Sequence, residues 1–480
     1  MTKPLTQPAP RGYAGNLLSI QSDGGTMTNK EWTRLEAKLN DFDPAVRRDA
    51  LAACAAMHGE DAPPADGAVN MHCHSFFSYH AEGWSPSRIV WEAHKAGWYA
   101  AALCDFDVLD GLEEFLDAAR VVGLRAAVHL ETRAYVGEWA DLEINAPGEP
   151  GVAYVMGGGF PARPRPGSAP DEQLARFRQG AQTRNEALIG RINERLPEIA
   201  INFNREVRPL TPAGVATERH IISAYVARAE HRFADLRQRA AFWAPILGFG
   251  EDLAACRALL EDRPALEERV RGALAKQGGI GYVQPTPEQF PPLDRFIDWV
   301  RDCQAIPLIA WLDGTRGAER DCTALMDLMT SKGCAGLNLI PDRNWKDKTD
   351  AGRDLKRARL DEVVTEAARR HLPINIGTEM NRRGLPLADD LDGPVLGRYR
   401  HLFLEGARIL AGHTILATYA DMPYLGPRAE AIFADRADRN TFFAAVGALP
   451  PVTQELADRL LDAGPERALG LLGGLIRKQK

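Results

Sequence analysis

The chain has 480 residues, of which 45% are hydrophobic and 26% are charged, and its net charge is −7. This composition is typical of a folded globular protein, and the negative balance argues against a surface dedicated to nucleic acid. No run of about 18 apolar residues is present, so we expect no membrane-spanning helix. The seven cysteines are scattered and include no C-x-x-C pair, which favours reduced thiols and a cytoplasmic location.

The first 66 residues change composition twice. Residues 1–25 are rich in Pro, Gly, Ser and Thr, and we expect them to be disordered. Residues 26–66 are predicted to form a helical extension, because apolar residues from Leu35 to Met57 recur at helical spacing. A Pro-containing linker, residues 61–66, ends this extension.

From Val69 onward, short apolar runs alternate with helical patterns, a rhythm that predicts a parallel sheet. The runs lack an alternation of polar and apolar residues, as expected for strands that are buried on both faces. Seven runs are predicted to be strands: Val69–His72, Tyr99–Cys104, Arg125–Leu130, Gly151–Met156, Pro307–Trp311, Gly336–Ile340 and Ile374–Gly377.

A long helical segment separates the fourth strand from the fifth. Residues 161–290 are too many for a plain connection, and we predict a helical insertion that caps a barrel. The barrel is then built from residues 67–160 and 291–385, and residues 386–480 form a helical C-terminal extension. Because the insertion follows a strand end, we expect it to enter and leave at the rim of the active site.

Polar side chains gather at the expected carboxyl ends of the strands, where parallel barrels form their active sites. His72 and His74 are two residues apart, so both imidazoles point to one face of the strand and can hold one divalent metal ion. The later strand ends add side chains with oxygen or guanidinium groups: Asp105, Glu131, Arg133, Asp313, Asn338, Glu379 and Asn381.

Structural roles are the alternative for several of these residues. An Asp that follows a strand is often a helix cap, which is an alternative for Asp105. Glu131 could form an ion pair with Arg133 at the rim of the barrel.

The strand ends resemble those of the PHP family (polymerase and histidinol phosphatase), over about residues 67–160 and 290–385. In that family the first strand ends in H-x-H-x-x-x-S, which His72, His74 and Ser78 match, and the third ends in a glutamate, which Glu131 matches. The resemblance implies an α/β fold: a distorted seven-stranded TIM-like (β/α)7 barrel with a large helical insertion and helical extensions at both ends.

The chain departs from the family pattern at several metal-binding positions. Phe106 and Trp311 stand where the family has histidines, and Val155 or Tyr154 stands at a third such position. Side chains without ligand atoms make a trinuclear site implausible. We therefore expect one divalent ion, or two at most. The ion, Zn, Mn or Fe, would be held by His72, His74, Glu131 and Glu379, with Asp313 and Asn381 as additional candidates.

The insertion carries a second point of resemblance. The segment Glu218-Arg219-His220-Ile221 is similar to an Arg-Pro-His-Ile element that faces the barrel mouth in some PHP phosphoesterases, although the arginine is displaced by one position. Arg219 and His220, together with Arg208, are candidates to contact an anion, and we expect at least one of them near the metal site. Capping and pairing within the insertion are the alternative for each.

The resemblance implies a metal-dependent hydrolase, and we favour a phosphoric ester hydrolase that acts on a small, anionic, phosphorylated substrate. Asp105 would orient or deprotonate the attacking water, and Arg133, Arg382 or Arg383 would bind an anionic group. Two alternatives stay open: a catalytically inactive PHP-derived binding protein, and a metal-dependent hydrolase of C–N bonds. We expect no nucleic-acid or membrane partner, and the sequence leaves the substrate and the oligomeric state open.

Overall fold

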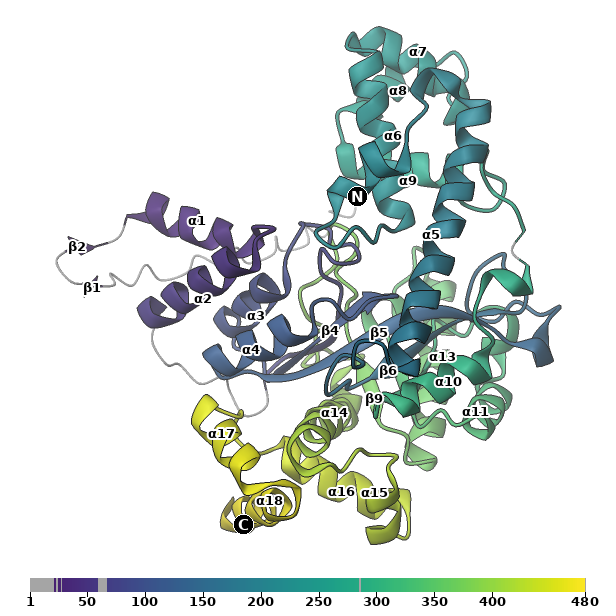
Figure 1. The fold of residues 1–480 in the computed structure, drawn as a ribbon. Helices are drawn as coiled ribbons and strands as arrows, with labels where there is room; N and C mark the ends of the chain where they lie inside the picture. Colours follow the sequence, from purple (N-terminus) through teal and green to yellow (C-terminus); the bar gives the residue numbers. More distant parts are fainter. Residues whose placement is uncertain (1–20, 23–24, 27, 59–66, 285, 480) are drawn as a thin grey trace, which may run out of the picture.

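The computed structural model describes residues 21–22, 25–26, 28–58, 67–284 and 286–479. Most of the segment expected to be disordered, and the linker at residues 61–66, lie outside the described residues. The centre of the protein is a seven-stranded sheet in the order β3 to β9, which curls into a barrel (Figure 1). The predicted α/β barrel with helical extensions is therefore confirmed.

The strands that form the barrel follow one another in the sheet in chain order. They are β3 (Val69–Cys73), β4 (Ala100–Phe106), β5 (Arg125–Tyr135), β6 (Val152–Gly158), β7 (Ile306–Ala310), β8 (Gly336–Leu339) and β9 (Ile374–Ile376). A separate antiparallel pair near the N-terminus consists of β1 (Gln21–Ser22) and β2 (Gly25–Thr26).

The prediction of an entirely parallel sheet is wrong at one strand. β6 runs antiparallel to both of its neighbours, with Leu130 opposite Gly157 and Val155 opposite Ile309. β5 continues to Tyr135, five residues beyond its predicted end, and the chain returns without a crossover helix. Residues 136–151 join the two strands without an α-helix, and an antiparallel pair needs no crossover helix.

The barrel closes where the end of β9 meets β3. The backbone N–H of Glu379 donates to the carbonyl of His72 at 2.8 Å, and that of His74 donates to the carbonyl of Glu379 at 3.0 Å. At Gly377, a Cβ atom would collide with the backbone nitrogen of His72, so only glycine permits this approach.

Helices surround the barrel in three groups (Figure 1). Those before and between the strands are α1 (Asn29–Ala37), α2 (Pro44–His58), α3 (Pro86–Lys95), α4 (Leu112–Val122), α10 (Leu293–Asp302), α11 (Cys322–Ser331), α12 (Pro341–Trp345) and α13 (Asp350–Arg369). The insertion holds α5 (Ala169–Arg195), α6 (Glu218–Arg232), α7 (Leu236–Ile246), α8 (Leu253–Leu260) and α9 (Arg263–Ala275). The C-terminal extension holds α14 (Arg400–Ala420), α15 (Pro427–Ile432), α16 (Arg436–Gly447), α17 (Gln454–Ala463) and α18 (Pro465–Gln479).

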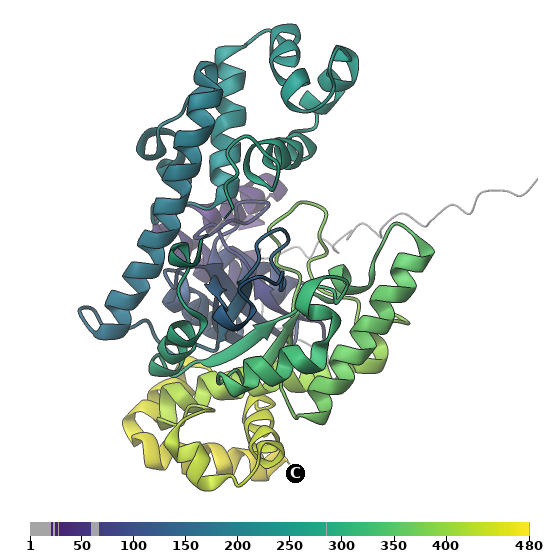
Figure 2. The ribbon, with the colours of Figure 1, turned by 90° about the vertical axis from the view of Figure 1, so that its right-hand side faces the viewer.

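The insertion forms an arm with a hydrophobic cluster of its own, which includes Ile192, Tyr225 and Trp243. Because β6 is antiparallel, the chain leaves it away from the carboxyl ends of the parallel strands, so the expectation that the insertion enters at the rim is wrong. The 27 residues of α5 span about 40 Å and carry the chain past the barrel to the arm. In both views the arm lies at one end of the barrel and the C-terminal helices at the other (Figure 2).

None of the helices in the described part of the chain combines the length and the apolar character that a membrane span requires.

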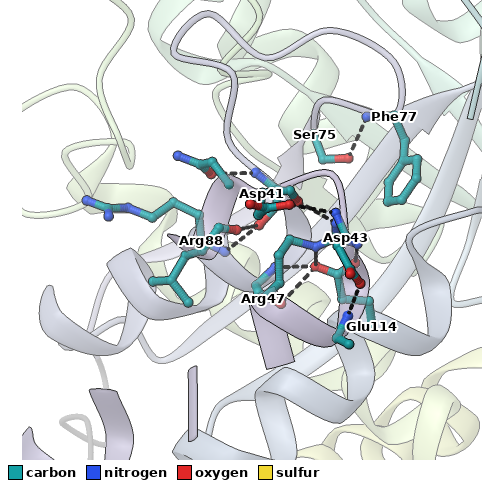
Figure 3. A network of polar contacts seen from close by, with 12 residues as sticks. Asp41, Asp43, Arg47, Ser75, Phe77, Arg88 and Glu114 are labelled. Atoms are coloured by element: carbon teal, nitrogen blue, oxygen red, sulfur yellow. Dashed lines mark hydrogen bonds and ion pairs between the residues drawn. The ribbon is translucent and has the colours of Figure 1, made fainter. Parts of the chain in front are cut away.

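Arg47 connects the N-terminal helices to the barrel (Figure 3). Its side chain is 2% exposed and forms an ion pair with Glu114 of α4, whose carboxylate also accepts from Ser87 at the start of α3. A second guanidinium nitrogen donates to the carbonyl of Asp41 at 2.6 Å. One buried guanidinium therefore links α2, α3 and α4.

We predict that Arg47→Met lowers the free energy of unfolding by about 3 kcal/mol, because it leaves the carboxylate of Glu114 without its charged partner. Urea unfolding followed by tryptophan fluorescence measures the change. The exposed Arg48→Met is the matched control and is expected to change the stability little, since its side chain is 77% exposed. A loss below about 1 kcal/mol for Arg47→Met would show that this link is not important for stability.

His413 links the C-terminal extension to the barrel. Its Nδ1 accepts from the backbone N–H of Tyr424 at 3.0 Å, so its Nε2 carries the proton and donates to the carbonyl of Gly159 at 2.9 Å. Gly159 has a φ of +74°, and a Cβ there would collide with the imidazole. If Nδ1 were protonated, its N–H would face the backbone N–H of Tyr424, and neither could accept a hydrogen bond. Burial lowers the pKa of His413 to about 4.

We predict a loss of stability on acidification that depends on His413. The unfolded chain binds a proton at this residue below about pH 6.5, whereas the folded protein binds one only below about pH 4. Its contribution to stability is therefore lost as the pH falls through this window. Urea unfolding at pH 7 and pH 5 should show a decrease that is about 2 kcal/mol smaller for His413→Gln than for the wild type. Equal decreases would contradict the assignment.

Candidate functional site

Three predicted metal ligands meet at the mouth of the barrel. His72 lies in β3, His74 follows it, and Glu131 projects from β5. The Nε2 atoms of His72 and His74 lie 3.3 and 3.5 Å from the same Oε2 atom of Glu131. One ligand atom from each residue lies within 4.8 Å of the others, and all three side chains are buried.

The atoms that face one another in this trio lack other partners. Both ring nitrogens of His72, Nε2 of His74 and Oε2 of Glu131 make no hydrogen bond within the described residues. An unpaired buried polar group costs about 1–3 kcal/mol, so such a cluster is typical of a site that binds an ion or water. Two imidazole nitrogens and a carboxylate oxygen fit Zn, Mn or Fe.

The burial and the charges of the trio favour the binding of a cation. Burial and the neighbouring imidazole of His72 lower the pKa of His74, which keeps its Nε2 available as a ligand. For His72, burial disfavours the charged form, but Glu131 outweighs it and raises the pKa. Burial raises the pKa of Glu131 in turn. The proton held by this pair is one that a bound metal ion would displace.

Asp105 is not among the residues that line the cavity and is held by two serines. Its Oδ1 accepts from the backbone N–H of Ser75 at 2.7 Å and from Oγ of Ser78 at 2.6 Å, while Oδ2 accepts from Oγ of Ser75 at 2.7 Å. Burial raises the pKa of Asp105 to about 6. Because Oγ of Ser78 also lies 3.4 Å from Nδ1 of His74, Asp105 positions the loop behind this imidazole. It neither caps a helix nor offers direct contact with a water in the cavity.

Glu379, the expected fourth ligand, lies beside the trio and not within it. Its carboxylate oxygens are 3.2 and 3.3 Å from one guanidinium nitrogen of Arg343. Glu379 and Met380 both have left-handed backbone conformations, with φ of +63° and +57°. Such conformations are unfavourable for residues other than glycine and cluster at functional sites.

A cavity of about 590 Å³ opens between the trio and the insertion. It brings together several predicted residues that lie far apart in the sequence. Its lining includes Glu131, Arg133, Arg219, Asp313, Asn338, Glu379 and Asn381. Trp311 also lines it, and Phe106 stacks on the imidazole of His74 with ring centroids 4.7 Å apart.

The charged residues of this lining are mostly paired. Arg133 donates to both oxygens of Glu149, at 2.9 and 2.8 Å, so the predicted alternative of an ion pair with Glu131 is wrong. Asp313 lies 3.2 Å from Nζ of Lys356. These side chains line the cavity and are held in place by their ion pairs, so they are positioned to orient a bound group.

The three residues of the insertion that are predicted to bind an anion have different surroundings in the structure. Arg219 lines the cavity, pairs with Glu268 and lies 5.4 Å from the ring centroid of Tyr79. His220 instead caps α6, because its Nδ1 accepts from the backbone N–H of Thr217, and burial lowers its pKa to about 3. Arg208 does not line the cavity. Of the three candidates, Arg219 alone lines the cavity.

Sequence reasoning missed four arginines of the cavity, Arg184, Arg191, Arg271 and Arg343, two of which show why. Arg343 follows β8 in the short helix α12, and its position just beyond a strand end could have identified it. Arg184 lies within α5, 4.7 Å from the ring centroid of Phe290, whose other neighbour is Arg133 at 4.8 Å. No strand-end signal marks a residue in the middle of a long helix.

No protein-family model matches this chain, and no curated protein is detectably similar to it. Several solved structures resemble it, including the following two. One, described as a "putative metal-dependent phosphoesterase" from Bifidobacterium adolescentis, is 21% identical, with a TM-score of 0.43 over 68% of this chain and 94% of the other. The second, an amidohydrolase from Chromobacterium violaceum with bound sulfate and no metal, is 16% identical, with a TM-score of 0.43 over 70% of this chain and 96% of the other. Likenesses at this level carry no conclusion about the reaction.

We predict that the double substitution His72→Ala/His74→Ala abolishes the binding of a divalent ion while the barrel stays folded. The reason is the loss of both imidazole ligands of the trio. Elemental analysis of protein purified without chelators measures the metal, and circular dichroism measures the fold. The exposed pair His231→Ala/His401→Ala is the control and should retain the wild-type metal content. Equal metal content in the two double variants would refute the site.

Proposed function

We propose that the protein is a metal-dependent hydrolase of the PHP type that acts on a small phosphorylated substrate. The observation that carries this proposal is the buried trio of His72, His74 and Glu131, whose facing atoms lack other hydrogen-bond partners among the described residues. Glu131 of the trio lines a cavity that is large enough for a small molecule.

The charge of the cavity lining favours an anionic substrate. Cationic side chains outnumber acidic ones, by eight to six. The cations are Arg133, Arg184, Arg191, Arg219, Arg271, Lys276, Arg343 and Lys356. The acids are Asp107, Glu131, Glu149, Glu218, Asp313 and Glu379. Guanidinium groups bind phosphate oxygens in pairs, and a divalent ion at the trio would add to the positive balance.

His72, His74 and Glu131 would hold the ion. A divalent ion bound there supplies Lewis-acid chemistry, which activates water as a nucleophile and polarises a phosphoryl oxygen. Arg133, held by Glu149 and stacked on Phe290, is rigid enough to orient an anionic group of the substrate.

The surrounding elements support this arrangement. Asp105, through Ser75 and Ser78, holds the loop behind His74. The insertion covers the cavity with residues such as Arg219 and Tyr282, and a covered site restricts the access of bulk water.

A catalytically inactive binding protein is the second candidate, and one observation favours it. Phe106 lies flat against the imidazole of His74, with 7° between the ring planes, and occupies space where a further ligand could otherwise stand. Hydrolysis of a C–N bond is compatible with the same activation of water, but the cationic lining gives it no specific support.

We predict that the protein loaded with Zn²⁺, Mn²⁺ or Fe²⁺ hydrolyses small phosphate esters. Glu131→Gln should lower this activity at least about 100-fold, because it removes the carboxylate of the trio. A colorimetric phosphate-release assay across a panel of phosphate esters and amides, with and without chelator, measures it. Lys30→Gln, on the exposed face of α1, is the control. Cleavage of amides alone would support the C–N hydrolase, and a metal-loaded protein that is inert on both panels would support the binding protein.

A further inference from the structure

Arg343 places a fixed positive charge beside the proposed metal centre. Its side chain is 43% exposed, yet its guanidinium reaches the carboxylate of Glu379, which is 7% exposed, at 3.2 and 3.3 Å. Arg343, Glu379 and Glu131 line the same cavity. The ion pair thus lies next to the trio, in the wall of the same cavity.

The backbone prevents Glu379 from leaving this place. The residue and its successor, Met380, both have left-handed φ angles, and hydrogen bonds hold them there. The carbonyl of Glu379 accepts from the backbone N–H of His74 at 3.0 Å, and that of Met380 accepts from Ala81 at 3.0 Å. Because the loop is held on both sides, the fold sets the position of the Glu379 backbone at the mouth of the barrel.

The carboxylate of Glu379 lies close to the trio. The backbone of Glu379 is hydrogen-bonded to that of His72 and of His74, and Glu379 lines the same cavity as Glu131. A carboxylate so close to two metal ligands would normally attract a cation. Here a guanidinium supplies that cation from the protein itself.

We propose that Arg343 takes the place of a second metal ion and limits the centre to one divalent ion. This inference rests on the proposed metal site. Two consequences follow from the charges. The guanidinium repels a second dication, and it occupies the carboxylate of Glu379. Without it, oxygen atoms of Glu379, Asn381 and Glu131, which line one cavity, would be available to a hard cation such as Mn²⁺.

The test is the number of Mn²⁺ ions per chain at saturating Mn²⁺, measured by equilibrium dialysis and elemental analysis. We expect one ion for the wild type and two for Arg343→Met. Arg343→Gln, which also removes the charge, should bind two, whereas Arg343→Lys should bind one. The double variant Arg343→Met/Glu379→Gln should return to one, because it removes the carboxylate that the second ion needs. Electron paramagnetic resonance provides an independent signature, since two neighbouring Mn²⁺ ions couple magnetically.

Lys356→Met is the matched control. Lys356 lines the same cavity and pairs with Asp313 at 3.2 Å, so its removal changes the net charge equally. If Lys356→Met binds one Mn²⁺ ion per chain, the result supports a specific role for Arg343. If it binds two, the inference is overturned. One ion for folded Arg343→Met and Arg343→Gln would also overturn the inference while the proposed function stands. A wild type that binds no ion would instead remove the metal centre itself and this inference with it.

Discussion

The candidate site depends on the closure of the barrel between β3 and the end of β9. Two backbone hydrogen bonds join Glu379 to His72 and His74, and Gly377 permits the approach because it has no Cβ. The closure brings residues separated by about 300 positions into contact. Once it forms, the imidazoles of β3 face Glu131 of β5, and the carboxylate of Glu379 lies beside them.

The antiparallel β6 determines how the insertion reaches this site. The chain leaves β6 at the far side of the barrel, so α5 must run the height of the barrel before the arm begins. Along that path α5 contributes Arg184 to the cavity wall, and the arm contributes Arg219. The insertion therefore contributes to the cavity wall from several separate segments, α5 and the start of α6 among them.

The sequence predicted the barrel and the trio well, because both depend on local signals. Apolar runs marked all seven strands, and the i, i+2 spacing of His72 and His74 set their common face. Other features depend on tertiary contacts. The capping role of His220 follows from a hydrogen bond within α6, and the binding of Asp105 by two serines follows from a loop conformation. One signal in the sequence could have indicated the antiparallel direction of β6: no helical pattern lies between the third and fourth predicted strands.

The most direct test of the account is the anomalous scattering of crystals grown with Zn²⁺ or Mn²⁺. We expect one strong peak about 2.0–2.3 Å from Nε2 of His72, Nε2 of His74 and a carboxylate oxygen of Glu131. Such a peak would show that the unpartnered atoms of the trio form a metal centre. A map without a peak at the trio, in crystals saturated with the metal, would contradict the central claim.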